Sequence, residues 1–221
     1  MLFCKYLFAF EHPKRPFMQE ILPALYHWTT FHESIQEEVH SYYLAFTDPA
    51  ILIDPRVPAE GLSWFENRPP PQHSYLTNRH HYRHSDQFQN AFGTTVWCHE
   101  AGLHEFTRGE TVQPFQHGGE LPSGILALEV GVLCPEETTF YIPQVGGILA
   151  LGDALIRSND QLGFVPDPLL GDDPEAVKEG LCQVFRRHLQ RDFEHLLFAH
   201  GKPWIGGAKA GLRQFLQGQP K

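Results

Sequence analysis

The chain has 221 residues, of which 42% are hydrophobic and 19% are charged, and it contains seventeen Phe and four Trp. This length and composition predict a soluble globular protein with enough apolar material for the core of one large domain. The formal net charge of −9 argues against a nucleic-acid partner, because phosphate binding requires a basic surface.

The beginning of the chain is apolar, but it has the features of neither a signal peptide nor a membrane span. Residues 1–10 are interrupted by Lys5, lack a small-residue cleavage site and are too short to cross a bilayer. We therefore expect no membrane partner. We assign residues 1–19 to an N-terminal extension or first strand, and residues 20–221 to a single domain. Four widely separated cysteines indicate reduced thiols and a cytoplasmic location: Cys4, Cys98, Cys134 and Cys182.

The first half of the chain reads mainly as strands. Aromatic and β-branched residues predict strands at residues 24–31 and 39–46, and an apolar run at 50–53 ends in the turn signal Asp54-Pro55. Further along we expect a short helix at 59–67, a strand at 74–77, a helix at 84–92 and a strand at 94–98.

The second half combines strands with the clearest helix. We expect loops and short strands at 100–124, strands at 125–131, 138–142 and 147–151, a hairpin turn at 143–146 and a long loop at 155–172. Asp173 and Pro174 suit the cap and first position of a helix, and a strand at 195–199 and a helix at 207–216 follow. The apolar face of the helix that begins near Asp173 is formed by Val177, Leu181, Val184, Phe185 and His188. Two packed sheets with helices outside both fit this order best.

Polar residues follow three of the apolar strands. These segments are Thr77-Asn78-Arg79-His80, the run from Gly147 to Asp153, and Ala199-His200-Gly201. Rigid strands can direct such residues into one cleft, where His and Asp side chains could converge on a divalent metal ion.

In these segments and in their order, the chain resembles the metallo-β-lactamase-fold superfamily, which includes glyoxalase-II-like hydrolases. Leu52-Ile53-Asp54-Pro55 is similar to the family's strand-ending Asp turn, Leu76-Thr77 to the start of its metal loop, Asp153 to its bridging Asp, and Ala199-His200-Gly201 to its late His-Gly turn. The resemblance implies an α+β fold, a four-layer αββα sandwich of two mixed β-sheets with helices on both outer faces.

The chain departs from the family at several of the positions that bind metal. The family loop Thr-His-x-His-x-Asp-His, placed on Thr77, puts Asn78, His80, Tyr82 and Arg83 at its ligand positions, and Leu133 takes the place of a later His. Only His80, Asp153 and His200 remain as usual ligands, so the resemblance implies a degenerate site that lacks a full dinuclear centre.

Two neighbouring residues extend this interpretation. Arg83 offers no lone pair to a metal, and we hypothesise that its guanidinium reaches Asp153 in place of the cation. His84 lies four residues after His80 and is a further candidate ligand, although a half-exposed helix residue is the simpler interpretation. Asp54 is expected to orient its turn through backbone hydrogen bonds.

Two main functions are compatible with these residues. The favoured hypothesis is a metal-free, non-hydrolytic protein without a cofactor, which binds a small molecule or a partner in the old cleft, lined by Asn78, Tyr82, Arg83, Leu133 and Asp54. The alternative is a hydrolase of an ester, thioester or phosphoester that uses zinc or another divalent metal, held by His80, Asp153 and His200. A third reading makes Arg83, Tyr82 and His80 metal-independent polar catalysts. A homo-oligomer is compatible with each.

Overall fold

The structure is a computed structural model that describes residues 17–219. The predicted N-terminal extension or first strand lies outside the described residues except for residues 17–19, and Cys4 also lies outside them. Within the described part of the chain, Cys98, Cys134 and Cys182 are free cysteines.

The first of two large sheets has seven strands in sequential order, β1 to β7. Strands β1 to β4 pair antiparallel, whereas β4 to β7 pair parallel, so the sheet is mixed. Its strands are β1 (Gln19–Leu22), β2 (Leu25–His32), β3 (Glu37–Leu44), β4 (Ile51–Ile53), β5 (His73–Tyr75), β6 (Thr95–His99) and β7 (Val112–Phe115).

The second large sheet has six strands in the order β15-β14-β11-β10-β9-β8. Strands β11 and β14 are parallel and the other pairs are antiparallel. Its strands are β8 (Glu120–Leu121), β9 (Ile125–Glu129), β10 (Thr138–Ile142), β11 (Ile148–Leu151), β14 (His195–Phe198) and β15 (Trp204–Ile205). The predicted hairpin turn at 143–146 joins β10 to β11, because these strands pair antiparallel with Ile142 opposite Ile148.

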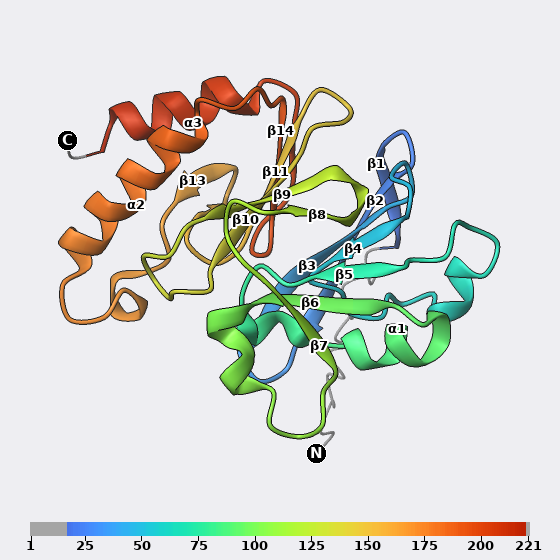
Figure 1. The fold of residues 1–221 in the computed structure, drawn as a ribbon. Helices are drawn as coiled ribbons and strands as arrows, with labels where there is room; N and C mark the ends of the chain where they lie inside the picture. The colour runs from blue at the N-terminus through green and yellow to red at the C-terminus, as the bar shows by residue number, and fades with distance from the viewer. Residues whose placement is uncertain (1–16, 220–221) are drawn as a thin grey trace, which may run out of the picture.

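Helices cover the outer faces of the two sheets. In Figure 1, α2 (Pro174–His188) and α3 (Ala208–Gln217) lie outside the second sheet, while α1 (Ser85–Phe92) lies beside the first. The shorter 3₁₀ turns are η1 (Leu62–Phe65), η2 (Arg79–Tyr82), η3 (Glu100–Glu105), η4 (Pro122–Gly124) and η5 (Asp167–Leu169). This arrangement confirms the predicted α+β sandwich of two mixed sheets.

Alternation along the strands builds the layers. Ile148 and Ala150 of β11 join the cluster between the two sheets, while Leu149 and Leu151 join the cluster beneath α2 and α3. All four are at most 2% exposed. Burying a leucine or isoleucine side chain contributes about 1.5–3 kcal/mol, so a strand buried on both faces reads as a continuous apolar run.

Two predicted elements are wrong in detail. The helix expected at 59–67 is only the 3₁₀ turn η1, which starts after Gly61 at a φ of 77° and is soon followed by the Pro69-Pro70-Pro71 run. The long loop expected at 155–172 contains a hairpin of β12 (Ile156–Ser158) and β13 (Gln161–Gly163). Its two-residue turn is formed by Asn159 and Asp160, both at positive φ, as type I′ turns require.

No helix among residues 17–219 combines the length and the apolar character needed to cross a membrane. The predicted cytoplasmic location stays a prediction.

Candidate metal site

The ends of four strands bring the polar residues of the site together. Asp54 follows β4 and Thr77 follows β5, and these strands are parallel neighbours in the first sheet. Asp153 follows β11 and His200 follows β14, which are parallel neighbours in the second sheet. Because parallel strands end on the same side, each sheet directs one pair of residues to the shared edge.

Two histidines converge on one oxygen of Asp153. The Nε2 atom of His81 lies 3.1 Å from Asp153 Oδ1, and the Nε2 atom of His200 lies 3.2 Å from the same oxygen. The ligand atoms of these three residues all lie within 4.8 Å of one another. Asp153 Oδ1 is buried and lacks a hydrogen bond of good geometry, so the three side chains point at a shared space and do not satisfy one another fully.

Asp54 orients one of these histidines from behind. Its Oδ2 atom lies 3.0 Å from His81 Nδ1 and accepts a hydrogen bond of 2.6 Å from the hydroxyl of Thr77, while its Oδ1 atom accepts one of 2.9 Å from the Thr77 backbone N–H. A carboxylate at Nδ1 favours the tautomer that leaves the Nε2 lone pair of His81 free for a metal. Asp54 therefore does more than shape its own turn.

The charges around His81 set its protonation when no metal is bound. Burial alone would lower the pKa of His81, but the carboxylates of Asp153 and Asp54 outweigh burial and raise it to about 9. Burial would likewise raise the pKa of Asp153, yet His81 and His200 hold it well below its ordinary value. In the metal-free site one imidazolium thus lies between two carboxylates and offsets one of their two negative charges.

Asn78 and Arg83 support the site through different atoms. Asn78 donates from Nδ2 to Asp153 Oδ2 at 2.8 Å, and its Oδ1 accepts from the backbone N–H of His80 at the start of η2. Arg83 donates from Nη1 to the carbonyls of His40 and Asp54, each at 2.8 Å. No ion pair or hydrogen bond joins Arg83 to Asp153 within residues 17–219. The hypothesised contact is therefore not made: Nη1 of Arg83 is directed at two backbone carbonyls, and Nη2 is buried without a hydrogen-bond partner.

A buried carboxyl group, Glu137, lies next to the site. Its Oε1 accepts from the backbone N–H of Ala154 at 2.6 Å, and its residue is fully buried. Burial, and next the charge of Asp153, raise the pKa of Glu137 to about 8, so it is mainly uncharged at neutral pH. The run of four consecutive polar residues from Glu136 to Thr139 did not indicate that a carboxyl group would be buried beside the site.

Four other sequence-predicted residues lie elsewhere. His80 is exposed on η2, and the structure brings His81 to Asp153 and His200 in its place. The Nδ1 atom of His84 accepts from the Val57 backbone N–H at 3.0 Å. The hydroxyl of Tyr82 donates to Gln89 Oε1, and Leu133 packs against the cluster beneath α2.

The reason His81 replaces His80 is the local shape of η2. His81 leaves helical geometry with φ −93° and ψ 18°, and Arg83 follows at a φ of 49°. Aligning the family's metal loop residue by residue from Thr77 assumes a backbone that η2 does not have. The alignment therefore assigns the exposed His80 to the site. The one indication in the sequence was that His80 and His81 are adjacent, so that either imidazole ring was a possible ligand.

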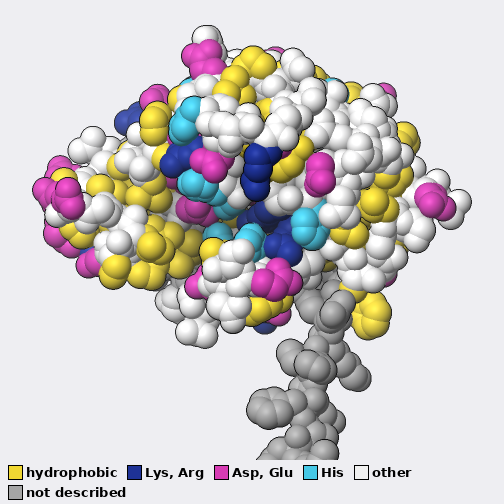
Figure 2. Space-filling model, turned by 90° about the horizontal axis from the view of Figure 1, so that it is seen from below, with side chains coloured by type: hydrophobic (Ala, Val, Ile, Leu, Met, Phe, Trp, Pro, Cys, Tyr) yellow, Lys and Arg dark blue, Asp and Glu magenta, His cyan; other side chains and the backbone are white. Residues whose placement is uncertain are grey.

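Charged and histidine side chains also gather on the molecular surface. In Figure 2, which views the molecule from below Figure 1, His, basic and acidic side chains surround a hollow. Near the site, Glu37 Oε2 lies 3.6 Å from His200 Nδ1, and the side chain of Glu37 is 66% exposed. A cation at this edge would therefore lie near the inner carboxylate of Asp153 and the exposed carboxylate of Glu37.

Comparison with solved structures places the chain in a structural class: it has the metallo-β-lactamase fold. It is similar to a metallo-β-lactamase family protein from Thermus thermophilus, with a TM-score of 0.63 and 16% identity over 90% of this chain and 80% of that chain. It is also similar to a β-lactamase domain protein from Burkholderia ambifaria, with a TM-score of 0.62 and 16% identity over 95% and 78% of the two chains.

Some of these similar proteins hold iron. One, solved in a di-iron-bound form, has a TM-score of 0.63 and 22% identity to this chain, over 83% of this chain and 96% of that one. The flavodiiron protein from Giardia intestinalis has a TM-score of 0.61 and 18% identity, over 94% of this chain and 61% of that one. Comparison with protein-family models and with curated protein sequences found no match.

Proposed function

We propose that this protein binds one divalent transition-metal ion through His81 Nε2, Asp153 Oδ1 and His200 Nε2, and that it uses the ion for hydrolysis. The observation that carries the proposal is the convergence of two imidazoles on a buried carboxylate oxygen that lacks a well-formed hydrogen bond. Two histidines and one carboxylate are a known catalytic ligand set for zinc and for non-haem iron, with positions left open for water or substrate. The iron in structurally similar proteins supports the same reading.

The surrounding residues suit such a site. Asp54 holds His81 by Nδ1, and Asn78 holds Asp153 by Oδ2, which leaves one donor atom of each ligand facing the shared space. Partners of this kind fix ligand orientation and strengthen metal binding. Loss of the proton on His81 must accompany binding, because an imidazolium has no free lone pair.

The chemistry expected of this site is hydrolysis of an ester, thioester or phosphoester. A bound divalent ion would lower the pKa of a water molecule and polarise the bond to be cleaved. The chain supplies the orientation: Asp54 and Asn78 hold the ligands, and His200 is carried on a turn next to the exposed carboxylate of Glu37.

Metal content tests this proposal directly. Protein purified without chelator or affinity-tag nickel is expected to contain about one zinc, iron or manganese ion per chain by elemental analysis. His81→Ala and His200→Ala should lose the ion, whereas His80→Ala, one residue away but exposed, should keep it. Loss of metal in His80→Ala with retention in His81→Ala would contradict the ligand assignment.

One observation favours a second function, a metal-free protein that binds a ligand in the same cleft. An imidazolium at His81 already offsets one of the two negative charges of Asp54 and Asp153, as its pKa of about 9 indicates. Protein that takes up no ion, even after incubation with zinc, iron or manganese, would support this second function and overturn the first.

A further inference from the structure

Arg83 directly follows η2, at a position where the resemblance to the metallo-β-lactamase fold implies a metal ligand. A guanidinium has no lone pair to offer a metal ion. Nη1 of Arg83 instead donates to two backbone carbonyls, those of Asp54 and His40, each at 2.8 Å, whereas Nη2 is buried without a hydrogen-bond partner. Within residues 17–219, the side-chain hydrogen bonds of Arg83 thus all come from one nitrogen atom.

Both residues that accept these bonds are connected to a candidate metal ligand. The carboxylate of Asp54 lies 3.0 Å from Nδ1 of His81. The backbone N–H of His40 donates to the carbonyl of Ala199 at 3.0 Å, and Ala199 directly precedes His200. The guanidinium is therefore connected to His81 through one residue and to the turn that carries His200 through another.

The backbone is strained at both ends of the bond between Arg83 and Asp54. Arg83 has a φ of 49° and Asp54 a φ of 46°, although neither is a glycine. Residues with a side chain keep such a left-handed conformation only where the surrounding contacts hold them in it. The carbonyl of Asp54 accepts from Nη1 of Arg83 and also from the hydroxyl of Ser41 at 2.8 Å. These bonds hold the strained turn that carries the carboxylate behind His81.

We propose that Arg83 is a positioning residue that holds both histidine ligands of the metal site by fixing the carbonyls of Asp54 and His40. The inference rests on the proposed function, because it gives Arg83 a role toward the ligands named there. The guanidinium does not touch the ion, but it keeps His81 and His200 directed at Asp153. Ligands have to be held within about 0.5 Å of their productive geometry, so a shift of either carbonyl weakens metal binding.

Three substitutions of Arg83 separate the donor nitrogen from the rest of the side chain. Arg83→Met keeps an unbranched stem without a donor, and Arg83→Gln keeps a polar amide that is too short to reach the carbonyls. Both should weaken zinc binding to the full-length protein by about tenfold or more, measured by competition with a chelator. Arg83→Lys should bind zinc within about threefold of the wild type, because one ammonium group can donate to both carbonyls as Nη1 does.

The absorption spectrum of the cobalt-loaded protein reports the ligand geometry itself. The spectrum should change in Arg83→Met and Arg83→Gln, and Arg83→Lys should restore it. A loss of stability that leaves the ligands in place would not change this spectrum.

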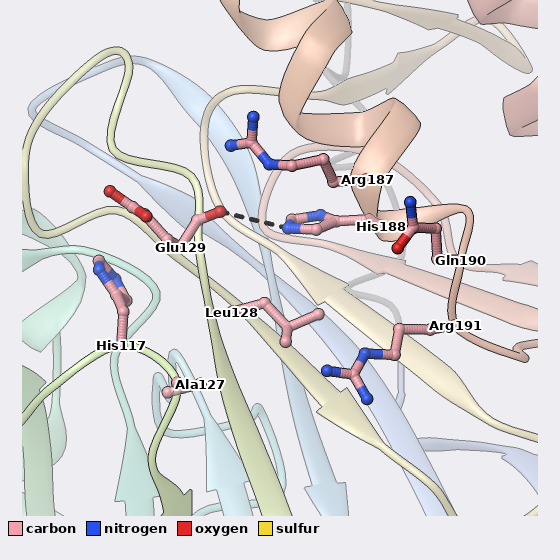
Figure 3. A pocket seen from close by; sticks show the side chains of 9 residues that line it. His117, Ala127, Leu128, Glu129, Arg187, His188, Gln190 and Arg191 are labelled. Atoms are coloured by element: carbon pink, nitrogen blue, oxygen red, sulfur yellow. Dashed lines mark hydrogen bonds between the residues drawn. The ribbon is translucent and has the colours of Figure 1, made fainter.

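Two other arginines provide matched controls. Arg68→Met removes a guanidinium that donates to the Trp64 carbonyl and lies 3.4 Å from the centroid of the Trp64 ring. Arg191→Met removes the same charge from a pocket beside the end of α2, which no residue of the metal site lines (Figure 3). Both controls should leave zinc affinity unchanged within about twofold.

Hydrogen exchange of the metal-free protein tests the same role without an ion. The amide of His40 should exchange about tenfold faster or more in Arg83→Met and Arg83→Gln, and Arg83→Lys should restore its protection. Zinc affinity equal to that of the wild type in Arg83→Met and Arg83→Gln overturns the proposal, as does an equal loss in Arg68→Met. Wild-type protein that takes up no ion contradicts the proposed function instead. Unchanged exchange at His40 would then overturn the role of Arg83 as well.

Discussion

The turns after β11 and β14 differ from the turn after β5 in how they place the candidate metal ligands. Leu151 and Phe198 are paired in register, and the candidate ligands Asp153 and His200 each lie two residues further on. After β5, by contrast, the chain enters a 3₁₀ turn with one non-helical residue and a left-handed Arg83, and it is His81 that reaches the site. The register of the paired strands fixes the positions of Asp153 and His200, whereas the local backbone geometry of η2 fixes the position of His81.

Substitution at the late turn should give the largest effect. Gly201 has a φ of 115°, and a Cβ built there would lie 2.0 Å from the carbonyl oxygen of Arg157. Gly201→Ala should therefore lower the free energy of unfolding by about 3 kcal/mol or more, measured by urea denaturation. The matched control is Gly163→Ala, where the new Cβ meets nothing within 4 Å. Equal effects of the two substitutions would show that the turn after β14 is not rigid.

Acid should weaken the pairing of strands β2 and β3, which carry His27 and His40 and support the turns after β5 and β14. His27 Nε2 lies 2.8 Å from His40 Nδ1, and burial lowers the pKa of His27 to about 4 and that of His40 to about 3. Both values lie below the usual 6.5, so the unfolded chain binds protons first, and stability present above pH 6.5 is lost as the pH falls towards 4.

We expect a loss on the order of 3 kcal/mol between pH 7 and pH 4 from His27 alone, by thermal or urea unfolding. His27→Gln should flatten this part of the profile. An unchanged slope in the variant would assign the acid sensitivity to other groups.

A smaller effect is expected from the hydroxyl that supports the turn after β5. Thr77→Val removes the donor to Asp54 Oδ2 while keeping the side-chain shape, and should cost about 1–3 kcal/mol of unfolding free energy. Thr139→Val is the control, because the buried hydroxyl of Thr139 has no hydrogen-bond partner and its removal should be neutral or stabilising. A larger loss in Thr139→Val than in Thr77→Val would contradict this view of the loop.

The same contrast explains what the sequence can and cannot predict. The apolar runs before Asp153 and His200 predict strands, and the end of a strand predicts where the residues just after it lie. Both positions therefore follow from the apolar pattern alone. His81 could not be chosen over His80, because the choice depends on the φ of residues 81 and 83 and on Asn78 capping η2.

The bonds of Tyr42 have a consequence for assembly. Its hydroxyl donates to the carbonyl of Phe198 at 2.8 Å and accepts from the N–H of the same residue at 3.0 Å. Strand β15 pairs with β14 only at His195 and Leu196, so Phe198 would otherwise present an open strand edge. An edge with free backbone groups recruits strands from other molecules. One buried phenol therefore satisfies both backbone groups that β15 leaves unpaired at Phe198, so no open strand edge remains there.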